Sequence, residues 1–545
     1  MIAGRRLCPA LIPGLYTLGF LLLWIPAGLS HLLSDDFSLV RNIQTGGMFG
    51  IWSGAGSRFF RPVISLSIYL DHLLWGVEPL GYHLTNLLFH LTNSVLIYFL
   101  VLELQIVLSP DDRGVRDAAR ATALLFLILP SHGEAIFWIA ARTDLIATVF
   151  FQISLIAFLR ALQSSSVIPI LISWTAAVIA YLSKESTIAL VPLCIAITVL
   201  RRHPGDSRSS ALRTVIICSG GHLVLLAAFW TWRSVRIGEW IGGYGTDAHI
   251  PLLNPAKLIN LPVMMCRSVL PYQSNQIVFG LSVVIVCMFV LAGALRLAPD
   301  TRRIHRQASI RCALLLAISL IPVFPLGTSI TDTQGERLVY APSLFSVCLL
   351  SFFLNSSEPG KTSGRLNRLI PILCLAFLAR SSVMYAQAGQ LSQKIVSELC
   401  SLEPANLALI NLPDNLRGAY VFRSCLPDAL ILGCDRQVVV TVCCTHPIDS
   451  RNTRIDCDLD SRGLTLRFPA KWMTRPDFKV LPGRSGDTPA TVSGNQLRIE
   501  WDALPTDAIP IMYSAGSLHR LRRPGVLSSA SVITSPMATL EVANH

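Results

Sequence analysis

Residues 118–160 read AARATALLFLILPSHGEAIFWIAARTDLIATVFFQISLIAFLR, two apolar runs joined by a short, more polar segment. The hydrocarbon core of a bilayer is about 30 Å thick, and a helix of about 20 apolar residues crosses it. The ionisable residues His132, Glu134 and Arg142 lie where the first run ends and the second begins. This stretch therefore predicts two membrane helices with charged side chains at the turn between them.

The same pattern continues along the chain. Of its 545 residues, 52% are hydrophobic and 14% are charged, and the mean hydropathy is +0.54. A soluble domain cannot bury so much apolar surface, so the composition predicts a polytopic α-helical membrane protein of about 11 transmembrane helices. The predicted spans lie near residues 10–31, 82–106, 118–132, 136–160, 167–183, 186–201, 212–232, 277–296, 309–326, 338–354 and 368–385.

Basic residues set the orientation of these spans. If the N-terminus, with Arg5 and Arg6, is cytoplasmic, the cytoplasmic loops are short and rich in arginine, as the positive-inside rule requires. The net charge of +12 is therefore typical of membrane topology and not of a nucleic-acid surface, so no nucleic-acid partner is expected. An odd number of spans places the C-terminus outside the cytosol.

The chain divides into two predicted domains. Residues 1–386 form a multi-span transmembrane catalytic domain, whose long external loops 32–81 and 233–276 contain amphipathic stretches suited to a membrane surface. Residues 387–545 have a soluble pattern and predict a small α+β or β-rich domain outside the cytosol. In it, residues 413–432 predict a helix, and residues 437–444, 463–470 and 496–503 predict strands. Six cysteines make disulfides plausible there, although the sequence does not define their pairing.

The acidic pair Asp35-Asp36 follows the first span on the external side. One carboxylate could take a proton from an acceptor hydroxyl, while the other orients an arginine or binds a metal. Alternatively, the pair caps the N-terminus of a helix that begins at Phe37.

Further ionisable residues lie at the external ends of later spans, and they are Arg61, His83, His132, Glu134, Arg142, Lys184, Glu185, Glu336 and Arg337. Charges beside hydrocarbon are costly, so a one-sided collection of them indicates a functional site. Each also has a plainer interpretation. Arg61 could reach the membrane surface, Lys184 and Glu185 could neutralise each other, and the groups around His132 and Arg142 could only pin a turn. The polar stripe of Tyr82, Asn86, His90 and Asn93 could join helices.

Arginine or lysine beside a carboxylate suits transfer from a lipid-linked sugar phosphate. The cations can hold the phosphate, which leaves without a strong acid, and one base then activates the incoming hydroxyl. Cofactors are not certain from the sequence. A divalent metal ion is possible, with Asp35 or Asp36 as its ligand.

The ordered segments SDDF, FFRPVISLSIYLDHLLWGVEPLGYHLTNLLFHLTN, LPSHGEAIFWIAARTDLIATVFF, LSKES and GERLVYAPS, which lie within residues 30–345, resemble the TMTC-type relatives of protein O-mannosyltransferases. These belong to the GT-C class of polytopic glycosyltransferases, which also includes the aminoarabinose transferase of lipid A. The resemblance implies an inverting transfer of a hexose such as mannose from a polyprenyl-phosphate sugar to an acceptor hydroxyl.

The resemblance also implies roles for individual residues. Asp36, together with Asp35, is expected to be catalytic, and Arg61, His83, Lys184 and Arg337 are expected to hold the donor phosphate. His132, Glu134, Arg142 and Glu336 complete the predicted substrate site. TMTC proteins end in tetratricopeptide repeats, whereas this chain ends in a cysteine-containing domain, so the acceptor could be a protein, a lipid or a glycan.

The expected location is a bacterial inner membrane, surrounded by membrane lipids, with the C-terminal domain in the periplasm. Two other functions fit the composition. A flippase or transporter of lipid-linked sugars should contain internal repeats or broken helices with charges near mid-span, which the sequence does not show. A non-catalytic membrane scaffold would tolerate loss of the acidic pair.

Overall fold

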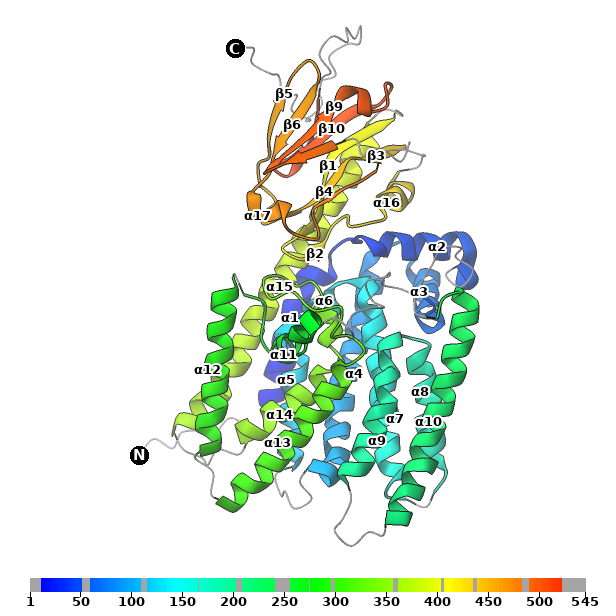
Figure 1. Cartoon of the computed structure of the whole chain (residues 1–545), viewed down its shortest axis with the longest axis vertical. Helices are drawn as coiled ribbons and strands as arrows, with labels where there is room; N and C mark the ends of the chain where they lie inside the picture. The colour runs from blue at the N-terminus through cyan, green and yellow to red at the C-terminus, as the bar shows by residue number, and fades with distance from the viewer. Residues whose placement is uncertain are drawn as a thin grey trace. The chain divides into compact units, whose positions relative to one another are not determined.

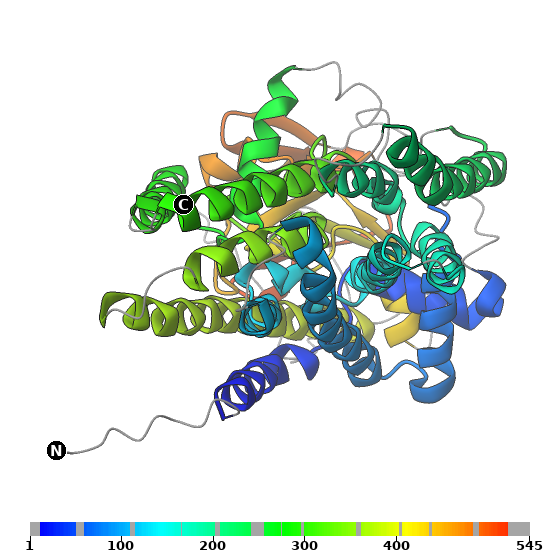
Figure 2. The same cartoon turned by 90° about the horizontal axis from the view of Figure 1, so that it is seen from below.

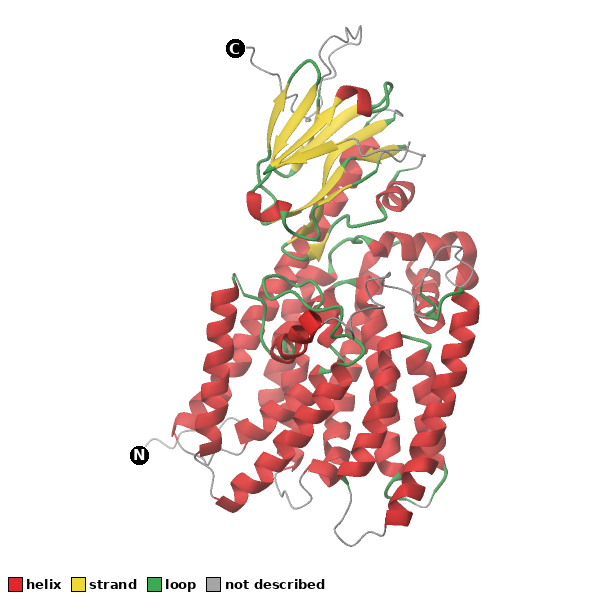
Figure 3. Cartoon of the chain, viewed as in Figure 1, coloured by secondary structure: helices red, strands yellow, loops and turns green. Residues whose placement is uncertain are grey.

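The computed structural model describes residues 11–50, 59–108, 115–164, 166–201, 208–240, 255–273, 275–295, 299–355, 361–402, 406–434, 439–482 and 490–521. It separates into two compact units (Figure 1). The first unit comprises residues 1–28, 46–76 and 81–382, and the second comprises residues 29–45, 77–80 and 383–545. Figure 3 shows strands in the second unit, whereas the described part of the first unit consists of helices and turns.

Every predicted span overlaps a helix of the structure. These helices are α1 (Leu11–Gly28), α4 (Pro79–Leu108), α5 (Val115–Leu127), α7 (Arg142–Ala161), α8 (Ile168–Tyr181), α9 (Leu190–Leu200), α10 (Arg208–Ile237), α12 (Gln276–Leu295), α13 (Pro299–Leu320), α14 (Ser343–Asn355) and α15 (Lys361–Ser401). Among the described residues, three helical stretches are long and apolar enough to cross a membrane, at Pro79–Leu104, Ile139–Ala161 and Leu369–Ser401. That all eleven helices cross stays a prediction.

Helices α7 and α8 illustrate how the helices of the first unit pack, and they lie side by side (Figure 2). Small residues of α8, Ser173, Ala176 and Ala177, are buried, whereas Leu171 and Ile172 are exposed. Small residues let two backbones approach closely, and large apolar residues outside suit lipid. The Ser154 hydroxyl of α7 donates a hydrogen bond to the Ser173 carbonyl of α8 at 2.9 Å.

The connection between α5 and α7 is longer than the sequence predicted. Residues 128–141 contain two 3₁₀ helices, η1 (Pro130–His132) and η2 (Ile139–Ala141), on either side of the short helix α6 (Gly133–Phe137). This connection is almost entirely buried. Irregular backbone at membrane depth is stable only where protein or a cavity covers it, so the apolar residues here belong to a buried connection and not to the two spans.

The predicted amphipathic stretches are short helices. In the first loop α3 (Pro62–Trp75) exposes large apolar residues including Leu70 and Leu74, and it buries Asp71. In the other loop a 3₁₀ helix η5 (Pro255–Ile259) leads into α11 (Asn260–Arg267). The first loop also contains α2 (Asp35–Gly50), whose residues as far as Thr45 belong to the second unit.

The second unit is built on the central strand β1 (Leu407–Leu416), which runs parallel to β10 (Ile509–Ser514), β3 (Val440–Val442) and β4 (Cys444–Ile448). The order of this sheet is β11-β10-β1-β4-β7, with β2 and β3 also pairing with β1, and a second sheet has the order β5-β6-β9-β8. The remaining strands are β2 (Ala419–Tyr420), β5 (Asp456–Leu459), β6 (Gly463–Arg467), β7 (Lys479–Val480), β8 (Ala490–Ser493), β9 (Gln496–Glu500) and β11 (Ser517–Arg520).

One element of this unit differs from its prediction. Residues 413–416 are the end of β1, and only α16 (Leu426–Gly433) is helical within the predicted helix 413–432. All ten residues of β1 are buried, and a strand buried on both faces lacks the alternating pattern that identifies strands in a sequence. The predicted strands are confirmed by β3, β4, β6 and β9. A disulfide joins Cys400 of α15 to Cys434, directly after α16.

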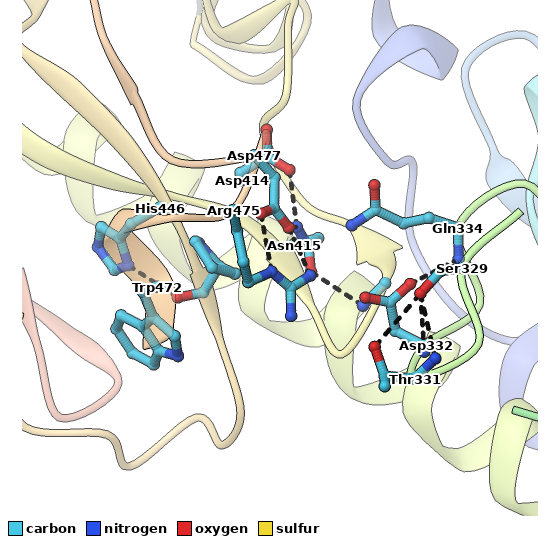
Figure 4. Close-up of polar contacts among 12 residues, drawn as sticks. Ser329, Thr331, Asp332, Gln334, Asp414, Asn415, His446, Trp472, Arg475 and Asp477 are labelled. Carbon is cyan, nitrogen blue, oxygen red and sulfur yellow. Dashed lines mark hydrogen bonds and ion pairs between the residues drawn. The ribbon is translucent and has the colours of Figure 1, made fainter. Parts of the chain in front are cut away.

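Buried polar side chains gather at the end of β1 (Figure 4). The Asn415 amide donates to Asp414 at 2.8 Å and to Asp477 at 2.7 Å. Arg423 pairs with Asp414 at 3.0 Å, and Arg475 pairs with Asp477 at 2.6 Å. Each buried carboxylate therefore has a guanidinium partner, which offsets the cost of removing it from water.

His446 of β4 lies at the other side of this cluster and stacks on Trp472, with ring centroids 5.4 Å apart. Its ring nitrogens contact the Asn411 amide at 3.1 Å and the Pro447 carbonyl at 3.0 Å. Because the ring is fully buried, its charged form is disfavoured, and burial lowers the pKa of His446 to about 4.

His446 should make the second unit sensitive to acid. The pKa of His446 in the folded state lies below its unfolded value of about 6.5. The contribution of neutral His446 to the free energy of unfolding is therefore complete above about pH 6.5 and is lost as the pH falls towards 4. We expect the midpoint of thermal unfolding of the full chain to fall between pH 7 and pH 5, by an amount equivalent to roughly 2 kcal/mol. In His446→Gln this fall should be smaller, whereas in the control His519→Gln it should match the wild type. Equal falls in all three proteins would contradict the assignment.

Candidate functional site

Several predicted site residues of the first unit lie in the connections between its helices, whereas His83 lies within α4 and Arg142 begins α7. These connections are residues 128–141, the 3₁₀ helix η3 (Glu185–Ala189) between α8 and α9, and the 3₁₀ helix η6 (Glu336–Val339) before α14. Most of the predicted ionisable side chains are buried, and each of the four cations forms an ion pair with a carboxylate from another part of the chain, namely Arg61, Arg142, Lys184 and Arg337. The result is a set of buried ion pairs at the helix ends.

Arg337 and Glu336 are adjacent in sequence but contact different partners. Arg337 forms an ion pair with Glu134, and its backbone N–H donates to the same carboxylate at 2.9 Å. Glu336 pairs with Arg267 of α11 at 2.6 Å, and both side chains are fully buried. The turn before η6 is held by Ser329, whose hydroxyl accepts the Thr331 and Asp332 N–H groups at 3.2 Å (Figure 4).

The two glutamates of these pairs have altered acidity. Burial raises the pKa of Glu134, and Arg337 opposes that rise. Burial also raises the pKa of Glu336, to about 7, against the opposing charge of Arg267. Each pair therefore places a carboxylate that holds a proton more readily than usual beside a permanent cation.

Lys184 and Glu185 do not neutralise each other. Lys184 forms a buried ion pair with Asp144 of α7, whereas Glu185 accepts hydrogen bonds from Arg61 at 2.7 and 3.2 Å. Burial alone would raise the pKa of Glu185, but the adjacent Arg61 guanidinium lowers it overall. Arg61 also stacks over Phe59, 4.2 Å from the ring centroid, so it is anchored in protein and does not simply reach towards the membrane surface.

Arg142 opens α7 and is completely buried. It donates to Asn86 and to the Tyr82 carbonyl, both at 2.7 Å, and it pairs with Asp71 of α3 at 2.5 Å. These contacts join α3, α4 and α7. The interpretation that Arg142 only stabilises a turn is therefore too narrow, because its side chain joins three helices.

The polar stripe on α4 also joins helices. Asn86 donates to the Trp138 carbonyl at 3.1 Å, and Asn93 donates to the Leu145 carbonyl at 2.9 Å. His90 contacts the Tyr340 hydroxyl at 2.8 Å. His132 contacts the Ser343 hydroxyl at 2.8 Å, and His83 is buried in the same unit.

A small cavity of about 20 Å³, room for about one water molecule, lies beside the Lys184–Asp144 pair. Its polar lining includes the side chains of Thr148, Ser186, Thr187 and Ser319, and its apolar lining includes Ala147, Phe151, Val323, Leu338 and Pro342. The cavity thus combines an ammonium–carboxylate pair and hydroxyl groups with an apolar wall.

Asp35 and Asp36 belong to the second unit and form the first turn of α2. Asp36 is completely buried, and its carboxylate accepts the Leu33 N–H at 3.0 Å. Asp35 is half-buried, and its carboxylate accepts a hydrogen bond from the Ser424 hydroxyl. The pair therefore lies in the first turn of a helix that begins at Asp35, where its negative charge is favourable for the helix dipole, and not before a helix that begins at Phe37. Its two carboxylates have different partners and different exposure.

Sequence reasoning missed two members of the ion pairs, Asp71 and Arg267. Each is a charged residue in an otherwise apolar stretch, SIYLDHLLW and PVMMCRSVL. An isolated charge in such a stretch is a signal that it faces protein and has a partner. Among the described residues, histidine, cysteine, aspartate and glutamate do not gather in threes as metal ligands would.

Fold and site together define an integral membrane protein with charged pairs buried at the ends of its helices. Its relatives are proteins named protein O-mannosyl-transferases, which confirms the TMTC resemblance. Tmtc1 of Drosophila melanogaster is 31% identical over 166 residues, which is 30% of this chain and 17% of that protein. Human TMTC4 is 24% identical over 361 residues, 55% of this chain and 47% of that protein. The chain thus spans less than half of each relative.

Protein-family models and solved structures were also compared. No family model matches the chain. The structure of ArnT from Cupriavidus metallidurans bound to undecaprenyl phosphate is 14% identical, with a TM-score of 0.46, over 79% of this chain and 86% of that one. An Archaeoglobus fulgidus oligosaccharyltransferase is 12% identical, with a TM-score of 0.37, over 72% of this chain and 57% of that one.

Proposed function

We propose that this protein is an inverting glycosyltransferase of the GT-C class. It moves a hexose such as mannose from a polyprenyl-phosphate donor to an acceptor hydroxyl on the extracytoplasmic side of a bacterial inner membrane. In this proposal the eleven helices that overlap the predicted spans all cross the membrane, and the C-terminal domain is periplasmic. The names of the relatives support the reaction, and the Cys400–Cys434 disulfide supports an oxidising compartment.

The chemical character of the residues around the small cavity beside Lys184, and not its size, supports the donor assignment. A polyprenyl-phosphate sugar carries a phosphate next to a hydrocarbon chain, and the cavity has an ammonium and hydroxyl groups next to apolar side chains. The phosphate would lie near Lys184 and would compete with the Asp144 carboxylate for its ammonium group.

The buried ion pairs have a second role in this proposal. Arg61 and Arg337 are each held in one orientation by a glutamate, and a guanidinium that is already oriented loses less entropy when it meets a phosphate. We assign the donor phosphate to Lys184, Arg61 and Arg337. In this proposal the other predicted residues stabilise the connections around the donor phosphate, and they are Arg142, Glu134, Glu336, His132 and His83.

The reaction requires one base. The acceptor oxygen attacks the anomeric carbon of the sugar from the face opposite the phosphate, while the bond from that carbon to the phosphate oxygen breaks. The proton of the acceptor hydroxyl passes to a carboxylate, which we assign to Asp36 with Asp35 as its neighbour, and polyprenyl phosphate leaves with the bonding electrons. One attack from the opposite face inverts the configuration at that carbon.

The experiment uses the purified chain in lipid with a panel of polyprenyl-phosphate sugars, and mass spectrometry follows the release of free polyprenyl phosphate. We expect turnover with at least one hexose donor, and we expect it to survive excess chelator because Lys184, Arg61 and Arg337 supply the positive charge. Loss of turnover in chelator and recovery with a divalent ion would make Asp35 or Asp36 a metal ligand. A folded protein that turns over no donor would favour a scaffold or a flippase.

A double variant, Lys184→Met with Asp144→Leu, tests the donor site without leaving a charge buried alone. Replacing a buried ion pair by apolar side chains of similar size is often neutral for stability, so the variant should fold. Its KM for the lipid donor should rise about tenfold or more. The exposed pair Lys471–Asp449 supplies the control Lys471→Met, which should leave KM unchanged. An unchanged KM in the double variant would remove Lys184 from the donor site.

A further inference from the structure

Within the second unit, the start of helix α2 is seated on a segment of the C-terminal domain, residues 421–428. The Ser34 N–H donates to the Val421 carbonyl at 3.0 Å. The Ser424 hydroxyl contacts the Ser34 hydroxyl at 3.3 Å and donates a hydrogen bond to the Asp35 carboxylate. These contacts join residues almost 400 positions apart in the sequence, so they arise from the tertiary structure.

Two further contacts join α2 to residues 421–428. The rings of Phe37 and Phe422 stack with centroids 6.0 Å apart and an angle of 14° between their planes. One turn further on, Arg41 forms an ion pair with Asp428 of α16. The first two turns of α2 are therefore held by a hydrogen bond, a ring stack and an ion pair from one short segment.

The backbone on both sides of the contact is unusual. Ser34 has a φ of 46° and Cys425 has a φ of 66°, in the left-handed region that residues other than glycine rarely adopt. Both residues lie directly beside the Ser424–Asp35 hydrogen bond. Strained residues of this kind persist only where surrounding contacts hold them, and they are concentrated at functional sites.

We propose that the C-terminal domain orients the acidic pair and that Ser424 is a positioning residue for the Asp35 carboxylate. This inference rests on the proposed function, in which Asp35 and Asp36 act at the acceptor hydroxyl. Ser424 does not touch the reacting atoms. Its hydroxyl fixes the rotation of the Asp35 carboxylate, while Phe422 and Asp428 fix α2, which carries both aspartates.

The kinetic signature follows from that role. Orientation of a catalytic group acts on the chemical step, and small displacements cost rate. Ser424→Ala should lower kcat about tenfold and leave KM for the lipid donor within about twofold, because a hydrogen bond to a charged group is lost while the donor site is intact. Ser424→Thr, which keeps the hydroxyl, should restore most of kcat. The control Ser397→Ala removes a hydroxyl that bonds only to the Lys394 carbonyl in its own helix and should behave as the wild type.

The Arg41–Asp428 pair allows a charge-exchange cycle. Arg41→Asp and Asp428→Arg should each lower kcat, and the double variant should recover part of the loss, because the pair is re-formed in the opposite sense. Recovery of kcat in the double variant, with thermal unfolding midpoints of the single variants equal to that of the wild type, shows that the contact between α2 and α16 acts on the reaction and not only on stability. Additive losses would overturn the role of this pair.

A structural readout separates this inference from the proposed function. Hydrogen exchange of the full chain should show lower protection of residues 34–38 in Ser424→Ala than in the wild type or Ser397→Ala, whether or not a donor has been found. Unchanged protection, or wild-type kcat in Ser424→Ala beside a loss in Asp36→Asn, would overturn the positioning role and leave the proposed function standing. Absence of turnover in the wild type together with lost protection would overturn the function and retain the structural contact.

Discussion

Asp36→Asn is expected to lower the turnover of the polyprenyl-phosphate donor by about 10²–10⁴-fold, which is the usual contribution of a general base. Asparagine keeps the size of the side chain and can still accept the Leu33 N–H through its amide oxygen, so the first turn of α2 should persist. KM for the donor should change little, since the donor phosphate is assigned to Lys184, Arg61 and Arg337. The measurement is the rate of polyprenyl phosphate release at saturating donor and acceptor.

Asp35→Asn is the matched comparison for this result. Asp35 is half-buried and accepts the Ser424 hydroxyl, whereas Asp36 is completely buried. We expect the smaller loss in Asp35→Asn, similar to that of Ser424→Ala. A large loss in Asp35→Asn with a small one in Asp36→Asn would exchange the two roles. Equal turnover in the wild type and both variants would refute the catalytic assignment of the acidic pair.

Arg142→Ala is expected to destabilise the protein by about 3–5 kcal/mol, because it leaves Asp71 as a buried charge without its cation. It also removes hydrogen bonds to Asn86 and to the Tyr82 carbonyl, which join α4 to α7. Thermal unfolding in detergent should show a large drop in the midpoint. Adding Asp71→Asn should recover part of the stability, since the uncompensated charge is then gone.

The exposed pair Arg160–Glu103 provides the control. Its arginine is on the same helix as Arg142, but that side chain is 54% exposed, and surface ion pairs contribute about 0–1 kcal/mol. Arg160→Ala should therefore leave the midpoint almost unchanged. If Arg142→Ala were as stable as Arg160→Ala, the buried network around Arg142 would not contribute as the structure indicates.

The helical elements of the first unit were predictable because their signal is local. Eleven apolar ranges were predicted, and each overlaps a helix, since a run of apolar residues is visible in the sequence without knowledge of its neighbours. The predicted ends of the two spans around residues 128–141 were wrong, because hydropathy is a local signal and the burial of these residues depends on the rest of the protein. Ile136, Phe137 and Ile139 are apolar because protein buries them in a connection, and a hydropathy pattern does not distinguish burial in protein from burial in lipid.

The buried charged residues were predictable as a set of residues but not as a set of contacts, and their role as a site stays a prediction. His132, Glu134, Arg142 and Lys184 were singled out because charge beside apolar runs is costly. Their partners were not predictable, because each lies on another element. Glu134 pairs with Arg337, 203 residues away, and Lys184 pairs with Asp144, 40 residues away.

The sequence by itself determined a chain of apolar helices with arginine-rich loops between them, an acidic pair after the first helix and a strand-rich C-terminal region. Hydropathy, charge and turn residues act over a few positions, so they can be interpreted without a fold. Only the tertiary structure decided which charge neutralises which and that Ser424 contacts Asp35, 389 residues away. Ion pairs and hydrogen bonds need atoms within about 3 Å of each other, and chain packing, not sequence distance, brings those atoms together.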